Sequence, residues 1–253
     1  MIELLETLGQ DVTLLLIEHD MDVALRVASR VVVMADGLMI ATGTPDEIRG
    51  SAIVRDTVMG LVQAPSGQIV FKGERIENQT PEKIARHGIS YVPQGRGLFP
   101  SLAVDEHLTM LAKGTGDKRW TIDGVYELFP RLAERCRNGG GQLSGGEQQM
   151  LAVGRALLLN GSLVIMDEPS EGLAPTIVDT LIEVAHRLVG EGVAVLVVEQ
   201  NLRAAVRMAN RQLVMVSGRI QAETSAAELI ANPELQQRYL GLEGVGTLNK
   251  EMS

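Results

Sequence analysis

A glycine-rich turn followed by an apolar strand with two carboxylates constrains the fold of this chain most. Residues 142–149 read QLSGGEQQ, a polar turn that predicts the start of a helix at residues 147–159. The first N–H groups of a helix lack intrahelical partners and lie at the positive end of its dipole, so they can accept an anion. Residues 163–169 read LVIMDEP, an apolar run that ends in two acidic residues and a proline.

The two adjacent carboxylates indicate chemistry at the end of this strand. Because side chains alternate along a strand, Asp167 and Glu168 should point in different directions. One carboxylate can then serve a metal ion while the other serves a water molecule. The alternative is a capped strand end and an ordinary Gly-rich helix start, but the order and spacing of the two motifs favour a site.

Composition narrows the class of protein. The chain has 253 residues, of which 45% are hydrophobic and 22% charged, as in ordinary globular proteins. The net charge of −9, with no block of Lys and Arg, argues against nucleic acid as the main partner. The single cysteine, Cys136, suits a reducing compartment. With no signal-peptide pattern and no apolar run near eighteen residues, we expect a cytoplasmic protein with at most peripheral membrane contact.

An internal repeat organises the two ends of the chain. Residues 12–61 align with residues 193–242 without a gap, and 14 of these 50 positions are identical. The shared pattern is a strand, a helix, two strands joined by a turn, and a helix. Because the register holds through both turns, we interpret the first sixty residues as a second, incomplete copy of the last sixty. In the C-terminal copy we expect strands at 193–198, 211–216 and 219–222 and helices at 202–209 and 226–231.

The unrepeated middle of the chain predicts an α/β core with a helical insertion. We interpret residues 98–142 as that insertion. The remaining predicted elements are a hairpin near residues 68–74, helices at 81–88, 104–113 and 125–135, a strand at 89–92 and a loop at 93–100.

With these motifs in this order, residues 60–253 resemble the ATPase subunit of an ABC transporter. Residues 91–94 read YVPQ and resemble the Q-loop, and residues 143–148 resemble the signature motif. Asp167 and Glu168 match the Walker B motif, and residues 170–175 (SEGLAP) resemble the D-loop. The resemblance implies ATP and Mg²⁺ as cofactors.

The resemblance also assigns roles to single residues. Asp167 and Gln94 would serve the magnesium ion, and Glu168 would be the general base that polarises the attacking water. Gln94 also reaches that water, and Gln200 falls where many family members have a switch histidine. An ordinary loop residue is the alternative for Gln94.

In this family the signature motif contacts the γ-phosphate held by the other subunit of a dimer. Ser144, Gly145, Gly146 and Gln148 would make that contact here. The resemblance therefore implies a second ABC ATPase subunit and membrane permease subunits as partners, with peripheral association at the inner face of the cell membrane.

The sequence segments YVPQGRGLFPSL, SEGLAP and VVEQN most resemble those of ATPase subunits of branched-chain amino acid importers. The N-terminal copy reads IEHDM at residues 17–21 and resembles the tail of the sister ATPase that pairs with such a subunit. His19 would match the switch histidine there, although a structural histidine is the alternative.

One family motif has no counterpart in the sequence. A P-loop (Walker A) reads G-x-x-x-x-G-K-S/T, in which N–H groups wrap the phosphates and the Lys neutralises them. No such string occurs, and the family's Lys would fall at Ser51. We therefore predict a truncated P-loop NTPase (ABC ATPase) core of the α/β class with a helical subdomain, the Walker A strand and loop missing. The expected domains are 1–60, the duplicated segment; 61–246, the ATPase domain; and 247–253, a tail.

Three functions follow from these expectations. The first is the ATP-binding, energy-coupling subunit of a branched-chain amino acid importer, with autonomous hydrolysis in doubt. The second is a non-hydrolysing partner that supplies only the signature motif in trans, and the third is a fusion remnant without function.

Loss of the Walker A strand should also leave a gap in the sheet. We hypothesise that the spare strand at residues 12–17 fills or covers it.

Overall fold

The computed structural model describes residues 31–35, 38–43, 56–64, 66–112, 119–216, 219–234 and 236. The chain divides into two compact units. One contains Met59–Asn210, and the other combines Met1–Val58 with Arg211–Ser253. The two units are described separately.

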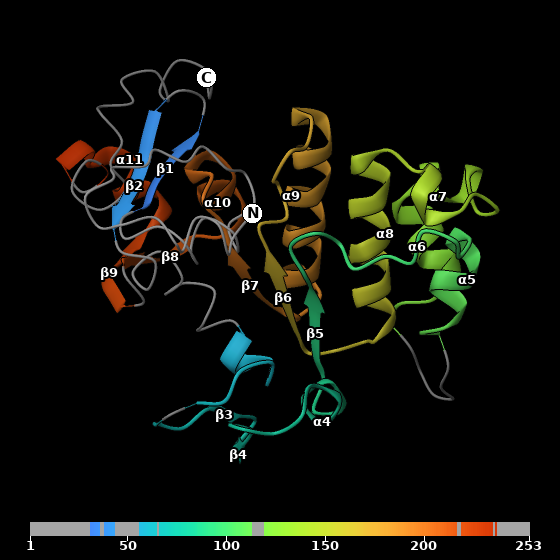
Figure 1. The fold of residues 1–253 in the computed structure, drawn as a ribbon, viewed down its shortest axis with the longest axis horizontal. Helices are drawn as coiled ribbons and strands as arrows, with labels where there is room; N and C mark the ends of the chain where they lie inside the picture. The colour runs from blue at the N-terminus through green and yellow to red at the C-terminus, as the bar shows by residue number, and fades with distance from the viewer. Residues whose placement is uncertain are drawn as a thin grey trace, which may run out of the picture. The chain divides into compact units, whose positions relative to one another are not determined.

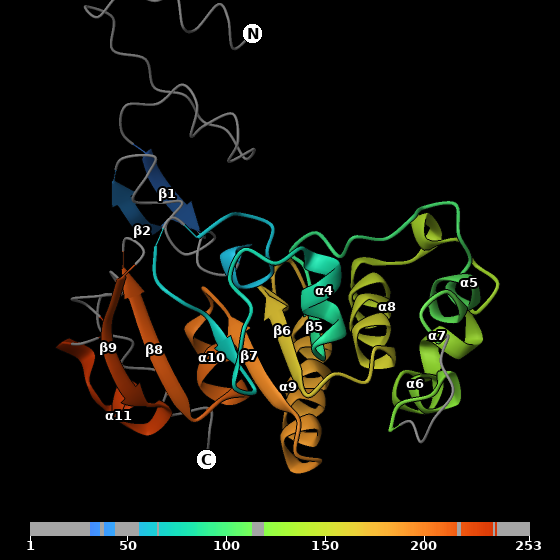
Figure 2. The same cartoon turned by 90° about the horizontal axis from the view of Figure 1, so that it is seen from below.

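A parallel three-stranded sheet is the centre of Met59–Asn210 (Figures 1 and 2). Its strands are β5 (Ile89–Val92), β6 (Leu163–Asp167) and β7 (Ala194–Val198), in the order β5-β6-β7. In register, Val92 lies beside Met166, and Asp167 lies beside Val198. Since all three strands run in the same direction, their carboxyl ends meet at one edge of the sheet.

The helices of this unit pack on the sheet and on one another. Beside the sheet lie α4 (Pro81–Arg86), α8 (Gly145–Leu158), α9 (Pro175–Gly190) and α10 (Leu202–Met208). The region expected as a helical insertion holds α5 (Val104–Thr109), α6 (Ile122–Leu128), α7 (Pro130–Glu134) and the short 3₁₀ helix η1 (Gly140–Gln142). A small hairpin joins β3 (Val70–Phe71) to β4 (Glu74–Arg75).

The helix predicted at residues 125–135 is in fact two helices. Helix α6 ends at Leu128 and α7 begins with Pro130 at its first position. Proline lacks an N–H donor and disfavours helical backbone in the residue before it, and Phe129 accordingly leaves the helical region at φ −127° and ψ 74°.

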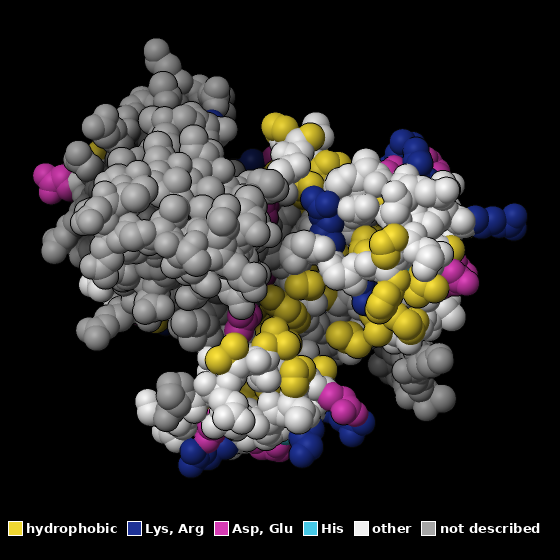
Figure 3. Space-filling view, viewed as in Figure 1, with side chains coloured by type: hydrophobic (Ala, Val, Ile, Leu, Met, Phe, Trp, Pro, Cys, Tyr) yellow, Lys and Arg dark blue, Asp and Glu magenta, His cyan; other side chains and the backbone are white. Residues whose placement is uncertain are grey.

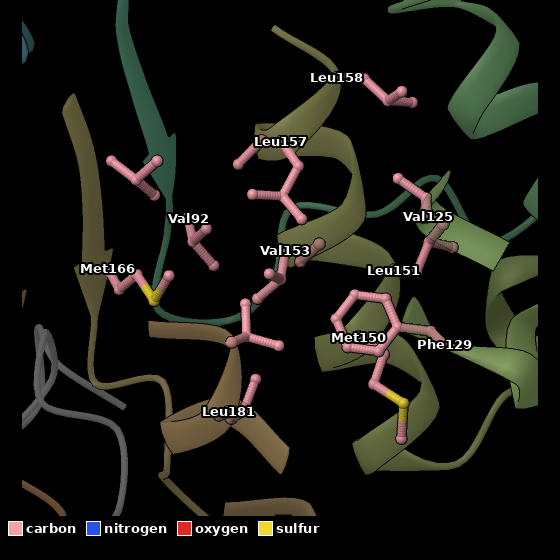
Figure 4. Close-up of a cluster of buried hydrophobic side chains, with 14 of the residues drawn as sticks. Val92, Val125, Phe129, Met150, Leu151, Val153, Leu157, Leu158, Met166 and Leu181 are labelled. Carbon is pink, nitrogen blue, oxygen red and sulfur yellow. The ribbon is translucent and has the colours of Figure 1, made fainter. Parts of the chain in front are cut away.

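The hydrophobic core lies where α8 packs between the sheet and α6 (Figure 4). Leu151, Val153 and Leu157 of α8 are fully or almost fully buried. They belong to the same cluster as Met166 of β6 and Val125 of α6. This packing fixes the position of α8, whose first residues form part of the candidate site.

Strand β7 is more exposed than its neighbours. Among the described residues it pairs only with β6, and Leu196 is 41% exposed while most of β5 and β6 is buried. The hypothesis that residues 12–17 cover a gap in the sheet concerns residues outside those that the structure describes, so it stays a prediction.

In the other unit, the two copies of the repeat contain hairpins with the same register. Strand β1 (Val31–Ala35) pairs with β2 (Leu38–Gly43), and β8 (Arg211–Val216) pairs with β9 (Arg219–Ser225), which leads into α11 (Ala226–Ala231). The bulge between Val33 and Met34 corresponds to the bulge between Val214 and Met215, each shifted by the same 181 positions. The internal repeat thus extends to a shared irregularity of the backbone.

Gly60 is a position where only glycine fits. Its φ is +69°, and an added Cβ would lie 2.3 Å from the backbone oxygen of Gln79. We expect Gly60→Ala to lower the free energy of unfolding by about 2 kcal/mol, since both the left-handed backbone and the clash oppose a side chain. Gly190→Ala is the matched control, because it ends α9 with open space around it and should be neutral or slightly stabilising. Urea denaturation of both variants tests this, and equal stabilities would contradict it.

Candidate functional site

Three strand ends bring the predicted catalytic residues together. Gln94 follows β5, Asp167 ends β6 with Glu168 directly after it, and Gln200 follows β7. The backbone N–H of Gln94 donates to Oδ2 of Asp167 over 3.2 Å. The residues named for metal binding and for water activation are therefore neighbours at one edge of the sheet.

Two glutamine amides hold the carboxylate of Glu168. Gln94 Nε2 donates to Glu168 Oε2 over 3.1 Å, and Gln200 Nε2 donates to Glu168 Oε1 over 2.6 Å. The Glu168 backbone has φ +44°, a left-handed conformation that is costly for a residue with a side chain. Both oxygens of this carboxylate are thus fixed by side chains from the two neighbouring strand ends.

The sequence did not identify two further acidic residues at this edge. Gln94 Nε2 also donates to Glu171 Oε2 over 3.1 Å, and the Ser170 N–H donates to Glu199 Oε1 over 2.8 Å. Glu171 is 77 positions from Gln94 in the chain, and no local pattern signals that contact. Glu199 could have been suspected, because it precedes Gln200 at the end of a predicted strand.

The environment of Glu168 disfavours its charged form. Burial raises the pKa of the Glu168 carboxyl above its ordinary value, the Gln200 hydrogen bond opposes this, and the nearby Glu171 carboxylate adds to it. Because its pKa is raised, Glu168 binds a proton more tightly in the folded chain than in the unfolded chain. This difference stabilises the fold at low pH, and the stabilisation is lost as pH rises through the folded-state pKa.

We therefore expect Glu168→Gln, which removes the charge but can accept from only one of the two glutamine amides, to gain about 1–3 °C in melting temperature relative to the parent chain between about pH 4.5 and pH 7.5. The difference from the parent chain should shrink as pH falls toward about 4.5, the ordinary pKa region of Glu. Thermal unfolding followed by circular dichroism measures this, with Glu183→Gln, exposed on α9, as the control. A gain that is independent of pH would contradict the electrostatic explanation.

The start of α8 forms the second part of the site. Ser144 is the N-cap: its Oγ accepts from the Glu147 N–H over 3.4 Å, and its own N–H and Oγ–H donate to the Glu147 carboxylate over 2.8 and 2.9 Å. This capping box begins the helix two residues earlier than the sequence predicts. A Cβ on Gly146 would lie 2.9 Å from Ile177 Cγ1, so α9 packs closely there.

The environment of the buried Glu147 carboxyl favours its charged form. Burial opposes its ionisation, but the hydrogen bonds from Ser144 and the nearby Arg135 guanidinium outweigh burial, and the pKa of Glu147 lies below its ordinary range. Arg135 Nε lies 2.9 Å from Glu147 Oε1. The first turn of α8 is therefore rigidly built, with Gly145 and Gly146 as its first two helical residues.

Gln148, the fourth residue predicted to contact the phosphate, uses both the oxygen and the nitrogen of its side-chain amide in hydrogen bonds within the chain. Its Oε1 accepts from Arg96 Nη1 over 2.9 Å, and its Nε2 donates to the Gly140 oxygen over 3.1 Å. The structure thus places Ser144, Gly145 and Gly146 at the helix start and turns Gln148 toward the loop after β5.

Comparison with known proteins decides the family. A family model described as "ABC transporter" matches residues 50–171. The high-affinity branched-chain amino acid transport ATP-binding protein BraG of Pseudomonas aeruginosa is 43% identical over 194 residues, which cover 76% of this chain and 83% of that protein. The chain belongs to the ABC transporter ATP-binding protein family.

Other ABC proteins agree with this assignment. A probable branched-chain amino acid transport ATP-binding protein, LivF, of Archaeoglobus fulgidus is 30% identical over 197 residues, covering 76% of this chain and 83% of its own. A solved nucleotide-free ATP-binding cassette from an ABC transporter has a TM-score of 0.63 and 23% identity, with 76% of this chain and 84% of that chain covered. This structural likeness shows the ABC ATPase fold, with its P-loop NTPase architecture.

The oxygen atoms at the strand ends can supply some, but not all, of the ligands of a magnesium ion. Magnesium prefers oxygen ligands and is usually held by one or two carboxylates together with substrate phosphates. Asp167 and the Gln94 amide oxygen provide such donors. Within the described ranges, no group of three or more His, Cys, Asp or Glu side chains could hold a metal ion by itself.

Over the same residues, no helix is long and apolar enough to cross a membrane.

Proposed function

We propose that this chain is an energy-coupling, ATP-binding subunit of an ABC importer for branched-chain amino acids. The observation that carries the proposal is the 43% identity to BraG across 83% of that protein. The Q-loop, signature, Walker B and D-loop motifs support it, because they lie at the ends of β5 and β6, at the start of α8 and in the loop between β6 and α9. Its partners are permease subunits in the membrane and a second ABC ATPase, with which it dimerises at the inner face of the cell membrane.

We propose further that the chain does not hydrolyse ATP by itself. Asp167 and Glu168 act on a nucleotide that a P-loop holds, and the sequence contains no P-loop string. The ABC family match begins at residue 50, beside Ser51, where the family's P-loop Lys would fall. The equal register of the two hairpins supports the origin of residues 1–60 from the end of a sister ATPase.

The intact start of α8 favours a second, compatible role. Ser144 and the two glycines after it form a complete capped helix start without any contribution from a P-loop. The chain can therefore offer its signature motif to ATP held by an intact partner. In that dimer, the site formed by the partner's P-loop and the signature motif of this chain is complete. The other site, which would need a P-loop from this chain, is inactive.

Reconstitution tests this proposal. Liposomes would contain the permease subunits, an intact sister ATPase and this chain, and ATP-driven uptake of labelled leucine, isoleucine and valine would be measured. We expect uptake and hydrolysis with both ATPase chains present, and neither with this chain as the sole ATPase. Uptake that is unchanged when this chain is omitted would refute the proposed role.

A further inference from the structure

Arg96 joins the loop after β5 to the first turn of α8. Its Nη1 donates to Gln148 Oε1 over 2.9 Å, and its guanidinium lies against the Cα of Gly145, where an added Cβ would be 3.3 Å from Nη2. Gln148 passes the contact on to the Gly140 oxygen. A single side chain thus spans 52 positions of sequence to reach the start of the signature helix.

This contact exists despite two local costs. The Arg96 backbone has φ +69° and lies between Gly95 at +72° and Gly97 at +58°, a conformation that suits glycine rather than arginine. Its positive charge also lies at the positive end of the α8 dipole. Neither cost would arise with glycine at this position, so the contacts of the Arg96 side chain with Gln148 and Gly145 must offset both costs.

A second arginine holds the same loop. Arg155 Nη1, further along α8, donates to the Gly97 oxygen over 2.6 Å. The Arg155 side chain is partly buried, and its guanidinium lies over the ring of Phe99 at 6.0 Å. The loop is therefore tied to α8 at two points, one at the beginning of the helix and one a few turns later.

We propose that Arg96 is a positioning residue that couples residues 93–97 to the phosphate-contacting start of α8. Gln94, two residues before Arg96, donates to Glu168 and Glu171, and Arg96 donates to Gln148, so a movement of Gln94 at the strand ends would reach the first turn of α8 through Arg96. The inference rests on the proposed function in one respect: the start of α8 serves ATP held by the partner subunit. The mechanical coupling itself does not depend on that role.

Hydrogen exchange of the isolated full chain tests the coupling directly. Arg96→Gly removes the guanidinium but suits the backbone conformation, so the fold should keep its melting temperature within about 3 °C. We expect amide exchange to rise at least about fivefold in both 93–98 and 143–149, and the Gln148→Met variant to give the same two increases. The double variant should exceed neither single variant. Arg86→Gln is the control, because the Arg86 side chain is exposed on α4.

Catalysis in the complex supplies the second readout. With an intact sister subunit, Arg96→Gly should lower kcat for ATP about tenfold while KM changes less than about twofold, because positioning acts in the transition state. Arg96→Lys, which can still donate to Gln148, should recover part of kcat. Exchange that rises in only one segment, or a kcat that Arg96→Gly leaves unchanged, would overturn the inference. If the parent complex fails to hydrolyse ATP, the proposed function is lost and the exchange result alone decides the coupling.

Discussion

Ser144→Arg is expected to reduce ATP hydrolysis by the complex with an intact sister subunit at least about 100-fold. The arginine would replace the hydroxyl that caps α8 and would fill the space in front of Gly145 and Gly146 with a flexible cation. If the proposed role holds, ATP held by the partner subunit would then lose the N–H donors of this helix start. Steady-state phosphate release at saturating ATP is the measurement.

The chain offers a matched control for this substitution. Ser225 caps α11 with the same capping box, in which its Oγ accepts from the Glu228 N–H over 3.2 Å and donates to the Glu228 carboxylate over 3.0 Å. Ser225→Arg should cost about 1 kcal/mol of stability, as loss of a cap does elsewhere, and leave hydrolysis within about twofold. If both variants lower hydrolysis equally, the effect of Ser144→Arg reflects helix stability and not the signature.

Leu151→Ala should lower the free energy of unfolding by about 3–4 kcal/mol. Leu151 is fully buried on α8, in the cluster that joins the sheet to α6 (Figure 4), and removal of its side chain leaves a cavity that the neighbours cannot fill. Urea unfolding can be followed by the fluorescence of Trp120, the single tryptophan of the chain, which is 3% exposed.

Leu159, just past the end of the same helix, provides the control. Its side chain is 43% exposed, and exposed apolar side chains also reach the surface on the α5–α8 side of this unit (Figure 3). Leu159→Ala should change the free energy of unfolding by no more than about 0.5 kcal/mol. Comparable losses in the two variants would show that α8 is not packed as described.

The parts of the fold that follow local rules were predictable from the sequence. The continuous apolar run before Asp167 predicted β6, and the Ser-Gly-Gly turn predicted the start of α8 within two residues. The parallel pairing of β5, β6 and β7 then brings the predicted catalytic residues together without further information. The repeat likewise predicted the hairpins of the second unit, whose shared bulge follows from shared sequence.

Long-range side-chain contacts were not predictable. Glu171 forms a hydrogen bond with Gln94, and Arg96 forms one with Gln148. Both contacts depend on how the loop after β5 packs against segments that are distant in the sequence. The prediction of one helix at residues 125–135 was wrong, because Pro130 lacks the N–H donor that a continuous helix needs and begins a separate helix. The role of Gln148 toward a ligand stays a prediction, and the contacts of its amide with Arg96 and Gly140 could not be read from the sequence.

We propose that this ABC protein needs a partner to hold ATP, and a thermal melt of the isolated chain with and without millimolar Mg-ATP can test that requirement. Ligand at about 100 times its dissociation constant adds about 2.7 kcal/mol of stability, which corresponds to a rise of roughly 5–10 °C for a chain of this size. We predict a cooperative melt that ATP shifts by less than about 1 °C. A rise of several degrees would show that an ATP pocket exists without a P-loop and would contradict the account.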